Sequence, residues 1–355
     1  MDLKSFCLDQ LARYPAAETQ DLVKALYQRE FGCGHMISDP ERGLKWLNDE
    51  LAACRQQAAP VEMPLTEPLG AFCRVHLRAL DAAGLSARTL FRLFELSAET
   101  PCGSMEAFRA QLKELESLIA AGELPLDKEE AHAFLSAYFA AGCPATHHSP
   151  AFSRAYAPAY RVIRAEYIRL LPLFAAVDRL TGEQERVIVA IEGGSASGKT
   201  TLAALLQGVY GCNVFHMDDF FLQMHQRTPE RFAEPGGNVD YERFREEVLE
   251  PLAAGKAFAY RPFSCSSMAL GEPVSVTPGI LSIVEGAYSM HPTLESFYDL
   301  SVFLRIDPQQ QAARILRRNG AQMQKRFLEE WIPLEQLYFG AFGTEKRCSM
   351  TLASL

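Results

Sequence analysis

Residues 193–200 decide the fold of half of this chain, and they read Gly193-Gly194-Ser195-Ala196-Ser197-Gly198-Lys199-Thr200. This loop fits the pattern G-x-x-x-x-G-K-[ST] at every position. A run rich in β-branched residues, 186–192, precedes the loop, and an apolar segment that favours a helix, 201–206, follows it. The motif therefore stands between a predicted strand and a predicted helix, which is the setting of a phosphate-binding loop.

The chemistry of the loop follows from its residue types. Glycines at both ends let the backbone turn so that successive N–H groups and a helix N-terminus point at an anion. Lys199 supplies a mobile positive charge for the terminal phosphates, and the Thr200 hydroxyl is a ligand for the Mg²⁺ that accompanies ATP. The alternative is a Gly/Ser-rich turn that binds nothing. The predicted ATP-binding residues are Gly193, Gly194, Ser195, Ala196, Ser197, Gly198, Lys199, Thr200 and Thr201.

Length and composition bound the class of protein. The 355 residues exceed one typical domain, and 48% of them are hydrophobic, which is ample for two packed cores. A net charge of −9 without a long basic run argues against nucleic acid as a partner. No run approaches the roughly 18 apolar residues of a membrane span, and the first residues lack the pattern of a signal peptide. Nine cysteines without a C-x-x-C pair are typical of reduced thiols, so we expect a cytoplasmic protein.

Two regions with different periodicity divide the chain. Apolar residues at helical spacing recur through residues 1–178, and no strand is predicted there. The polar stretch 181–185 breaks this pattern, which places a mainly helical domain of unknown role at 1–180 and a second domain at 181–355. Strands and helices alternate in the second domain, which predicts an α/β fold with a mostly parallel sheet. The predicted strands are 186–192, 212–217, 280–284 and 300–306, and the predicted helices are 199–208, 241–254, 308–318 and 325–338.

Four segments downstream of the loop form an ordered set. They are Val214-Phe215-His216-Met217-Asp218-Asp219-Phe220-Phe221, Pro235-Gly236-Gly237-Asn238-Val239-Asp240-Tyr241, Ile283-Val284-Glu285-Gly286 and Arg314-Ile315-Leu316-Arg317-Arg318. Together with the loop, this set resembles the uridine kinase-like branch of P-loop kinases, which also includes phosphoribulokinase and pantothenate kinase. The resemblance covers roughly residues 186–345. It implies an ATP- and Mg²⁺-dependent kinase that transfers the γ-phosphoryl group to a hydroxyl of a small metabolite, a nucleoside or a related polar alcohol.

Two adjacent carboxylates follow the second predicted strand. Asp218 and Asp219 stand at its carboxyl end, where α/β sheets place ligands. A carboxylate there can orient an attacking hydroxyl and accept its proton. By resemblance Asp218 is the base, and Asp219 is a substrate contact or the reserve base. The alternative is a strand end that carries two solvated acids.

Two further features point to the donor phosphates. Glu285 follows the apolar run 280–284, where a carboxylate can bind Mg²⁺ through water; an ordinary acid at a strand end is the alternative. Arg314, Arg317 and Arg318 share one face of a helix that Asp307-Pro308 begins and Gly320 ends. They can close over the triphosphate as a catalytic lid, or they can form a solvated basic face.

The acceptor side departs from the nucleoside kinase pattern. By resemblance, Asp240 contacts the hydroxyl groups of a sugar, although it also precedes an amphipathic helix and suits its N-cap. Nucleoside kinases of this group carry P-V-Y-D-F followed by H-S-R, whereas here residues 260–267 contain neither the Asp nor the His. Tyr260 and Arg261 remain substrate-binding candidates. The Arg261 guanidinium would suit an acidic substrate, because it can bind a carboxylate with two parallel hydrogen bonds.

The first domain contains two clusters with the residue types of zinc ligands. They comprise Cys33, His35, Cys143, His147 and His148. Their spacing matches no standard zinc pattern, so buried thiols and histidines at helix ends are the alternative. For the whole chain, the alternative to a kinase is an ATP-binding regulator whose P-loop domain switches the helical domain against a protein partner. The sequence predicts a small-molecule acceptor, excludes neither a monomer nor a homo-oligomer, and favours no membrane or nucleic-acid partner.

Overall fold

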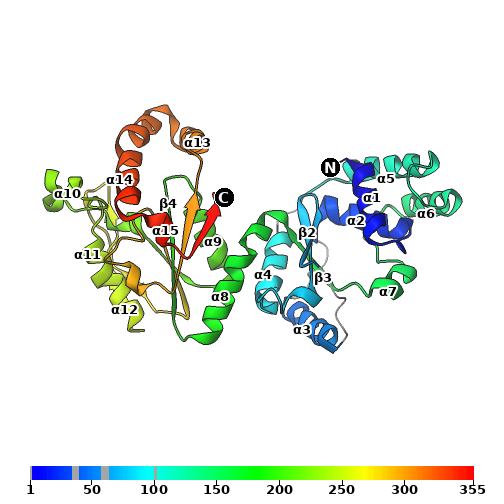
Figure 1. Ribbon diagram of the computed structural model, residues 1–355, viewed down its shortest axis with the longest axis horizontal. Coiled ribbons are helices and arrows are strands. Elements are labelled where there is room, and N and C mark those ends of the chain that lie inside the picture. Colours follow the sequence, from blue (N-terminus) through cyan, green and yellow to red (C-terminus); the bar gives the residue numbers. More distant parts are fainter. Residues whose placement is uncertain (1, 34–39, 57–63, 100–101) are drawn as a thin grey trace. The chain divides into compact units, whose positions relative to one another are not determined.

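The computed structural model describes residues 2–33, 40–56, 64–99 and 102–355. The chain divides into two compact units, Met1–Ala175 and Ala176–Leu355 (Figure 1). The first unit is mainly helical, and the second alternates strands with helices, as the sequence predicted. None of the described helices is both long enough and apolar enough to cross a membrane.

The helices of the first unit follow the predicted apolar spacing. In the second helix of the chain, Leu22, Val23 and Leu26 are buried together. The helices are α1 (Leu3–Arg13), α2 (Thr19–Phe31), α3 (Pro40–Gln56), α4 (Ala87–Ala98), α5 (Met105–Ala120), α6 (Lys128–Ala140) and α7 (Pro150–Tyr156); α8 (Leu171–Glu183) begins here and continues into the second unit.

The first unit also contains a sheet, so the prediction that it has no strand was wrong. The sheet is antiparallel, in the order β1-β2-β3, with β1 Thr66–Leu69, β2 Phe72–His76 and β3 Tyr160–Arg164. All five residues of β2 are buried, so this strand lacks the alternation of polar and apolar residues that marks a half-exposed strand. The strands are also short, and the partner β3 lies more than 80 positions along the chain, beyond the reach of a local pattern.

A buried ion pair explains how charged residues fit into this sheet. Arg74 on β2 donates through Nη1 to Glu67 Oε1 on β1 at 2.9 Å, and both residues are about 1% exposed. Gln28 Oε1 accepts from Arg74 Nε at 3.0 Å and from Nη2 at 2.8 Å. Charges are buried in proteins only when they are paired and hydrogen-bonded, so the tertiary fold supplies the partners that local sequence cannot show.

The second unit is built on a five-stranded parallel sheet in the order β12-β11-β4-β10-β5. All seven residues of the central strand are buried, which explains its run of branched aliphatic residues. The prediction of a parallel sheet is confirmed, and β12 is a fifth strand that the sequence did not predict. The strands are β4 Val187–Gly193, β5 Asn213–His216, β10 Leu281–Glu285, β11 Leu300–Arg305 and β12 Met350–Ala353.

Helices follow the strands in the second unit (Figure 1). The first of them, α9, packs on β4, β5 and β10 through Leu202, Ala203 and Leu206, all of which are buried. The helices are α9 Lys199–Tyr210, α10 Pro229–Ala233, α11 Tyr241–Phe244, α12 Glu250–Ala253, α13 Pro308–Arg326, α14 Ile332–Phe342 and α15 Thr344–Arg347. Two small antiparallel pairs, β6 Phe258–Tyr260 with β9 Val274–Val276 and β7 Phe263–Ser264 with β8 Ala269–Leu270, were not predicted.

The strand order places a ligand site at one edge of this sheet. The central strand β4 is followed by α9, while its two neighbours, β10 and β11, come much later in the chain. The connection from β4 leads through α9 to β5 on one side of β4, while the connection from β10 leads to β11 on the other side. In open parallel sheets, ligands bind at the carboxyl ends of the strands at such a point. The loop 193–200 lies directly after β4.

Candidate active site

The loop between β4 and α9 has the backbone that its glycines predict. Gly193 has a φ of +144°, and a Cβ there would lie 2.5 Å from the carbonyl oxygen of Leu304 on the neighbouring strand. Lys199 is 9% exposed, and its ammonium donates to the carbonyl oxygens of Gly193 at 2.8 Å and Gly194 at 3.0 Å. The lysine thus bridges the base of the loop, with its charge held where a phosphate would meet it.

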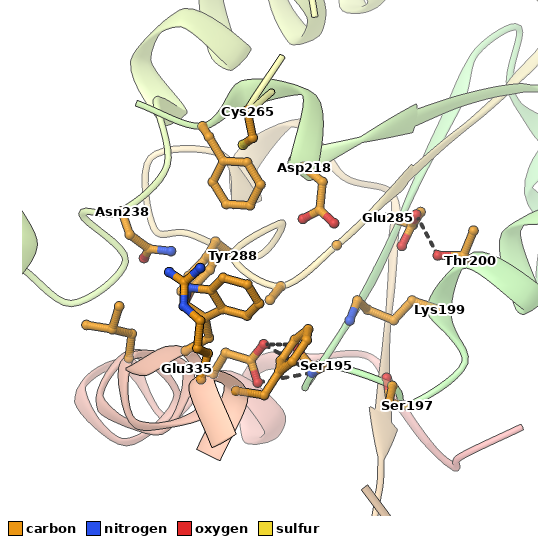
Figure 2. A pocket seen from close by; sticks show the side chains of 18 of the residues that line it. Ser195, Ser197, Lys199, Thr200, Asp218, Asn238, Cys265, Glu285, Tyr288 and Glu335 are labelled. Atoms are coloured by element: carbon orange, nitrogen blue, oxygen red, sulfur yellow. Dashed lines mark hydrogen bonds between the residues drawn. The ribbon is translucent and has the colours of Figure 1, made fainter. Parts of the chain in front are cut away.

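A cavity of about 1180 Å³ opens over this loop. Figure 2 shows Asp218 and Glu285 from two strand ends around the same space as Lys199 and Thr200 from the loop and Glu335 from α14. Among the candidates from the sequence, those that line the cavity are Ser195, Ala196, Ser197, Gly198, Lys199, Thr200, Thr201, Asp218, Glu285, Arg314, Arg317 and Arg318.

Glu285 and Thr200 form a pair with the donors of a magnesium site. The Thr200 hydroxyl donates to Glu285 Oε1 at 3.0 Å, and Glu285 is 5% exposed at the end of β10. A hydroxyl and a carboxylate beside a phosphate-binding loop are hard oxygen ligands, which suit Mg²⁺. His216 was not predicted for the site: its Nδ1 lies 2.6 Å from the same Glu285 oxygen, and this hydrogen bond raises the pKa of His216.

The close approach of two strand ends brings Asp218 toward this pair. Gly286 has a φ of +148°, and a Cβ there would lie 2.6 Å from Cβ of Met217. Glycine therefore allows the chain after β10 to pack against the 3-10 turn Met217–Phe220 that follows β5 and carries Asp218. The Asp218 side chain is accessible from the cavity. Desolvation within the cavity raises its pKa, Lys199 acts in the opposite direction, and the charge on Glu285 adds to the rise.

The predicted arginines lie on α13 beside the loop. Arg314 donates through Nη1 to the carbonyl oxygen of Ala196 at 3.2 Å, while Arg317 and Arg318 line the cavity with exposed side chains. Non-helical backbone at Gly320, with a φ of +78°, interrupts α13 where the sequence predicted its end. Beyond this interruption, Arg326 is a fourth arginine of the same helix that lines the cavity.

The chain is similar to several solved structures at low sequence identity. No family model matches the chain, and no curated protein does either. Solved structures, in contrast, match about half of the chain. A protein described as a possible uridine kinase from Bacillus stearothermophilus is 21% identical, with 51% of this chain and 98% of that chain covered at a TM-score of 0.39. D-glycerate 3-kinase from Cryptococcus neoformans is 16% identical, with 46% of this chain and 85% of that chain covered at a TM-score of 0.32. Shikimate kinase from Aquifex aeolicus is 15% identical, with 47% of this chain and 86% of that chain covered at a TM-score of 0.25.

The parallel strand order and the phosphate loop after the central strand decide the fold of the second unit. It is a parallel α/β fold with a P-loop directly after its central strand. Each of the three similar structures is matched over about half of this chain or slightly less.

Four candidates for substrate binding do not line the cavity over the phosphate loop. Asp219 is half-buried; burial raises its pKa, and a hydrogen bond with Tyr260 opposes this rise. Tyr260 is 7% exposed within the core, where it stacks on Phe220, and burial followed by the Asp219 charge raises its pKa to about 12. Arg261 is exposed, and its Nε donates to the carbonyl oxygen of Gly271 at 2.7 Å.

Asp240, the fourth of these candidates, has the capping role that the sequence allowed. It is 3% exposed, and its Oδ1 accepts from the backbone N–H of Arg243 at 3.1 Å as the N-cap of α11. Its Oδ2 accepts from Gln226 Nε2 at 2.8 Å. Both oxygens are therefore engaged by the protein, and the residue lies outside the residues that line the cavity.

Two buried polar side chains at the loop were missed by sequence reasoning. Glu335 on α14 is 3% exposed and accepts from the Ser195 N–H at 3.0 and 3.1 Å and from its hydroxyl at 2.5 Å. Gln311 on α13 donates to the Ser195 carbonyl oxygen at 2.8 Å. Nothing local marks either residue, because each lies in an ordinary helical pattern. Burial raises the pKa of Glu335, against the effects of Lys199 and Ser195.

The Glu335 carboxylate engages a loop N–H beside the phosphate site, which leads to a prediction. Glu335→Gln is expected to lower the Kd of a non-hydrolysable ATP analogue about 3- to 10-fold, or about 0.7–1.4 kcal/mol, because a negative charge is removed while an oxygen acceptor for Ser195 remains. Burial raises the pKa of Glu335, so the wild-type carboxyl takes up its proton as the pH falls. The difference in nucleotide affinity between Glu335→Gln and wild type is therefore expected to be largest at alkaline pH and to shrink toward acidic pH.

Calorimetric titration with Mg²⁺ present, from pH 8 down to pH 5.5, measures this effect. Glu329→Gln is the matched control, because it removes the same charge from an exposed position of the segment that leads into α14. Unchanged or weaker nucleotide binding by Glu335→Gln, against an unaffected control, would show that Glu335 holds the loop rather than opposes the phosphates.

The two clusters of histidines and cysteines in the first unit have the residue types of zinc ligands. His148 Nδ1 lies 2.8 Å from Asp21 Oδ1, its Nε2 lies 2.7 Å from the Tyr160 hydroxyl, and its ring stacks on Phe152. Cys33 and Cys143 are buried, and His35 lies outside the described residues. Within the part of the chain that the structure describes, no group of three His, Cys, Asp or Glu residues could hold a metal ion.

Proposed function

We propose that this protein is an ATP- and Mg²⁺-dependent kinase that transfers the γ-phosphoryl group of ATP to a hydroxyl of a small polar metabolite; nucleosides belong to this class. One observation carries the proposal. The carboxylate of Asp218 lines the same cavity as the phosphate loop and the Thr200–Glu285 pair. A protein that only binds ATP needs no free carboxylate facing the terminal phosphate, whereas a kinase uses one to orient the attacking hydroxyl.

The donor side contains the groups that phosphoryl transfer requires. Lys199 and the loop N–H groups would neutralise the β- and γ-phosphates, and Arg314, Arg317 and Arg318 would add positive charge from α13 as negative charge develops on the transferred group. Thr200 and Glu285 would hold Mg²⁺, which supplies further charge neutralisation between the β- and γ-phosphates.

On the acceptor side, Asp218 would perform the proton transfer. The hydroxyl oxygen of the acceptor bonds to the γ-phosphorus, the bond from this phosphorus to the β–γ bridging oxygen breaks, and ADP leaves. The hydroxyl proton passes to the Asp218 carboxylate. The raised pKa of Asp218 supports this role, because a carboxylate with a higher pKa is a stronger base toward the hydroxyl proton.

The test is substrate-dependent release of ADP. The full-length protein is incubated with ATP, Mg²⁺ and a library of hydroxylated metabolites, and ADP is measured by a coupled assay, while calorimetry measures ATP binding. The proposal expects at least one acceptor to raise turnover well above the background hydrolysis. Tight binding of ATP with no acceptor effect across the library would overturn it and would favour an ATP-binding regulator.

A further inference from the structure

The cavity contains a basic residue, Arg227, that belongs neither to the phosphate loop nor to α13. Arg227 lies in the segment between the turn Met217–Phe220 and α10, and it lines the cavity together with Phe221 and Leu222 of the same segment. The other basic side chains among the described lining residues are Lys199, Arg314, Arg317, Arg318 and Arg326. These five come from the loop or from α13, the two elements that the proposed function assigns to the donor phosphates, whereas Arg227 comes from a different segment of the chain.

The side chain of Arg227 is anchored at one end only. Its Nε donates to the carbonyl oxygen of Leu222 at 2.9 Å, and its Cζ lies 5.7 Å from the ring centroid of Phe263. Its two terminal nitrogens make no hydrogen bond or ion pair with any residue that the structure describes. They are also not sealed in the interior, since they are not among the buried nitrogens without a partner. The guanidinium is thus held in place, with its two-pronged end available to a ligand.

The anchoring segment is the one that carries the proposed base. Asp218 and Leu222 are four residues apart, and the Phe220 carbonyl oxygen accepts from the Asp240 N–H at 2.7 Å, while Phe221 pairs with Val239. This pairing ties the backbone between the base and the arginine's anchor to the segment that also carries Asn238. The spacing between Asp218 and Arg227 is therefore set by hydrogen-bonded backbone rather than by a free loop.

None of the acidic side chains that line the cavity forms a described ion pair with Arg227. The acidic side chains among the described lining residues are Asp218, Glu285 and Glu335. Glu285 is engaged with Thr200 and His216, and Glu335 with Ser195. Phe221, Phe232 and Trp331 give the cavity apolar walls, where an unpaired charge attracts an anion more strongly than it would in open water.

We infer that the acceptor is a small hydroxylated molecule with an anionic group of two or more oxygens, a carboxylate or a phosphate monoester, which Arg227 binds while the hydroxyl lies at Asp218. A guanidinium with two free parallel N–H donors matches the two oxygens of such a group. The inference rests on the proposed function. It also reassigns a role that the sequence suggested for Arg261, which is exposed, does not line the cavity and is bonded to Gly271.

The experiment compares acceptors matched in their hydroxyl groups. Trios such as glycerol, glycerate and glycerol 3-phosphate, or ribose, ribonate and ribose 5-phosphate, are assayed with wild-type protein by ADP release. An anionic member of a trio is expected to have a kcat/KM at least about 100-fold above its neutral counterpart. Comparison of the carboxylate acceptor with the phosphate acceptor in each trio shows which of the two anionic groups the protein prefers. This comparison requires no variant, so misfolding cannot obscure it.

Variants then assign the preference to one residue. Arg227→Gln is expected to raise the KM of the anionic acceptor about 30- to 100-fold and to change kcat and the KM of ATP less than about 3-fold. Arg227→Lys restores charge without the two-pronged geometry and should recover part of the affinity. Arg261→Gln is the matched control and should leave the KM unchanged. Thermal melting checks that each variant is folded.

The results separate this inference from the proposed function. Neutral acceptors preferred by wild type, or an anionic preference that survives in folded Arg227→Gln, would overturn the role of Arg227 and leave phosphoryl transfer standing. No turnover with any acceptor would instead overturn the proposed function. A shift in the KM of ATP as large as that of the acceptor would place Arg227 on the donor phosphates and contradict the inference.

Discussion

Asp218→Asn is expected to lower kcat for phosphoryl transfer by at least about 10²- to 10³-fold, while the Kd of ATP changes less than about 3-fold. The amide keeps the size of the side chain and its place in the cavity, but it cannot accept the hydroxyl proton. Asp218 is bordered by Lys199 and Glu285 and is accessible from the cavity, so removal of its charge affects the reacting hydroxyl rather than the core. ADP release with the best acceptor, together with calorimetric binding of an ATP analogue, measures the two quantities separately.

Asp219→Asn is the control for this prediction. Asp219 is the adjacent carboxylate, it does not line the cavity, and it contacts Tyr260. We expect this variant to retain kcat within about 5-fold. The reverse result, with loss of turnover in Asp219→Asn and retention in Asp218→Asn, would move the proton acceptor to Asp219, the reserve candidate from the sequence.

Lys199→Ala is expected to weaken both ATP binding and phosphoryl transfer, with the Kd of ATP raised at least about 30-fold and kcat lowered at least about 100-fold. Lys199 is 9% exposed, and its ammonium donates to the loop carbonyls of Gly193 and Gly194, where it would meet the phosphates and also holds the loop. The variant loses the charge that neutralises the transferred group and the hydrogen bonds that stabilise the loop. Titration with an ATP analogue and single-turnover kinetics measure the two losses.

Lys325→Ala is the control, because it removes an exposed lysine of α13 that pairs with the exposed Glu329 at 3.9 Å and does not line the cavity. It should bind ATP as the wild type does. ATP affinity in Lys199→Ala within 2-fold of wild type would contradict the placement of the triphosphate over this loop. Thermal melting without nucleotide separates a weaker loop from a lost ligand contact, since only the former lowers the melting temperature of the free protein.

Local pattern was sufficient for the donor half of the site. The phosphate loop, Asp218 and Glu285 each stand at the end of a predicted strand, and parallel strands bring their carboxyl ends to one edge, so the sequence alone is enough to expect their meeting in one cavity. Arg314, Arg317 and Arg318 share a helical face by spacing alone. These predictions depend on short-range periodicity and on the geometry of a sheet, both of which are encoded within a few neighbouring residues.

The acceptor half depended on contacts that no local pattern carries. Tyr260 and Arg261 were candidates because they stand where nucleoside kinases bind the base, but the two small strand pairs around them place Tyr260 in the core and Arg261 at the surface. Arg227 and Glu335 carry no motif. Arg227 lines the cavity while its Nε is bonded to the nearby Leu222 carbonyl oxygen, and Glu335 meets the loop from a segment far along the chain. Both placements depend on how whole elements pack.

By itself, the sequence determined that half of this protein is a parallel α/β unit with a loop of the phosphate-binding pattern, because eight contiguous residues between a strand and a helix suffice to build that loop. Only the tertiary structure decided which further side chains line the cavity and that the first unit contains a sheet. In both cases the deciding interactions join residues far apart in the chain: Arg74 of the sheet with Gln28 of α2, and Glu335 with Ser195 at the loop. Buried polar groups are stable only with such partners, and their partners exist only in the folded chain.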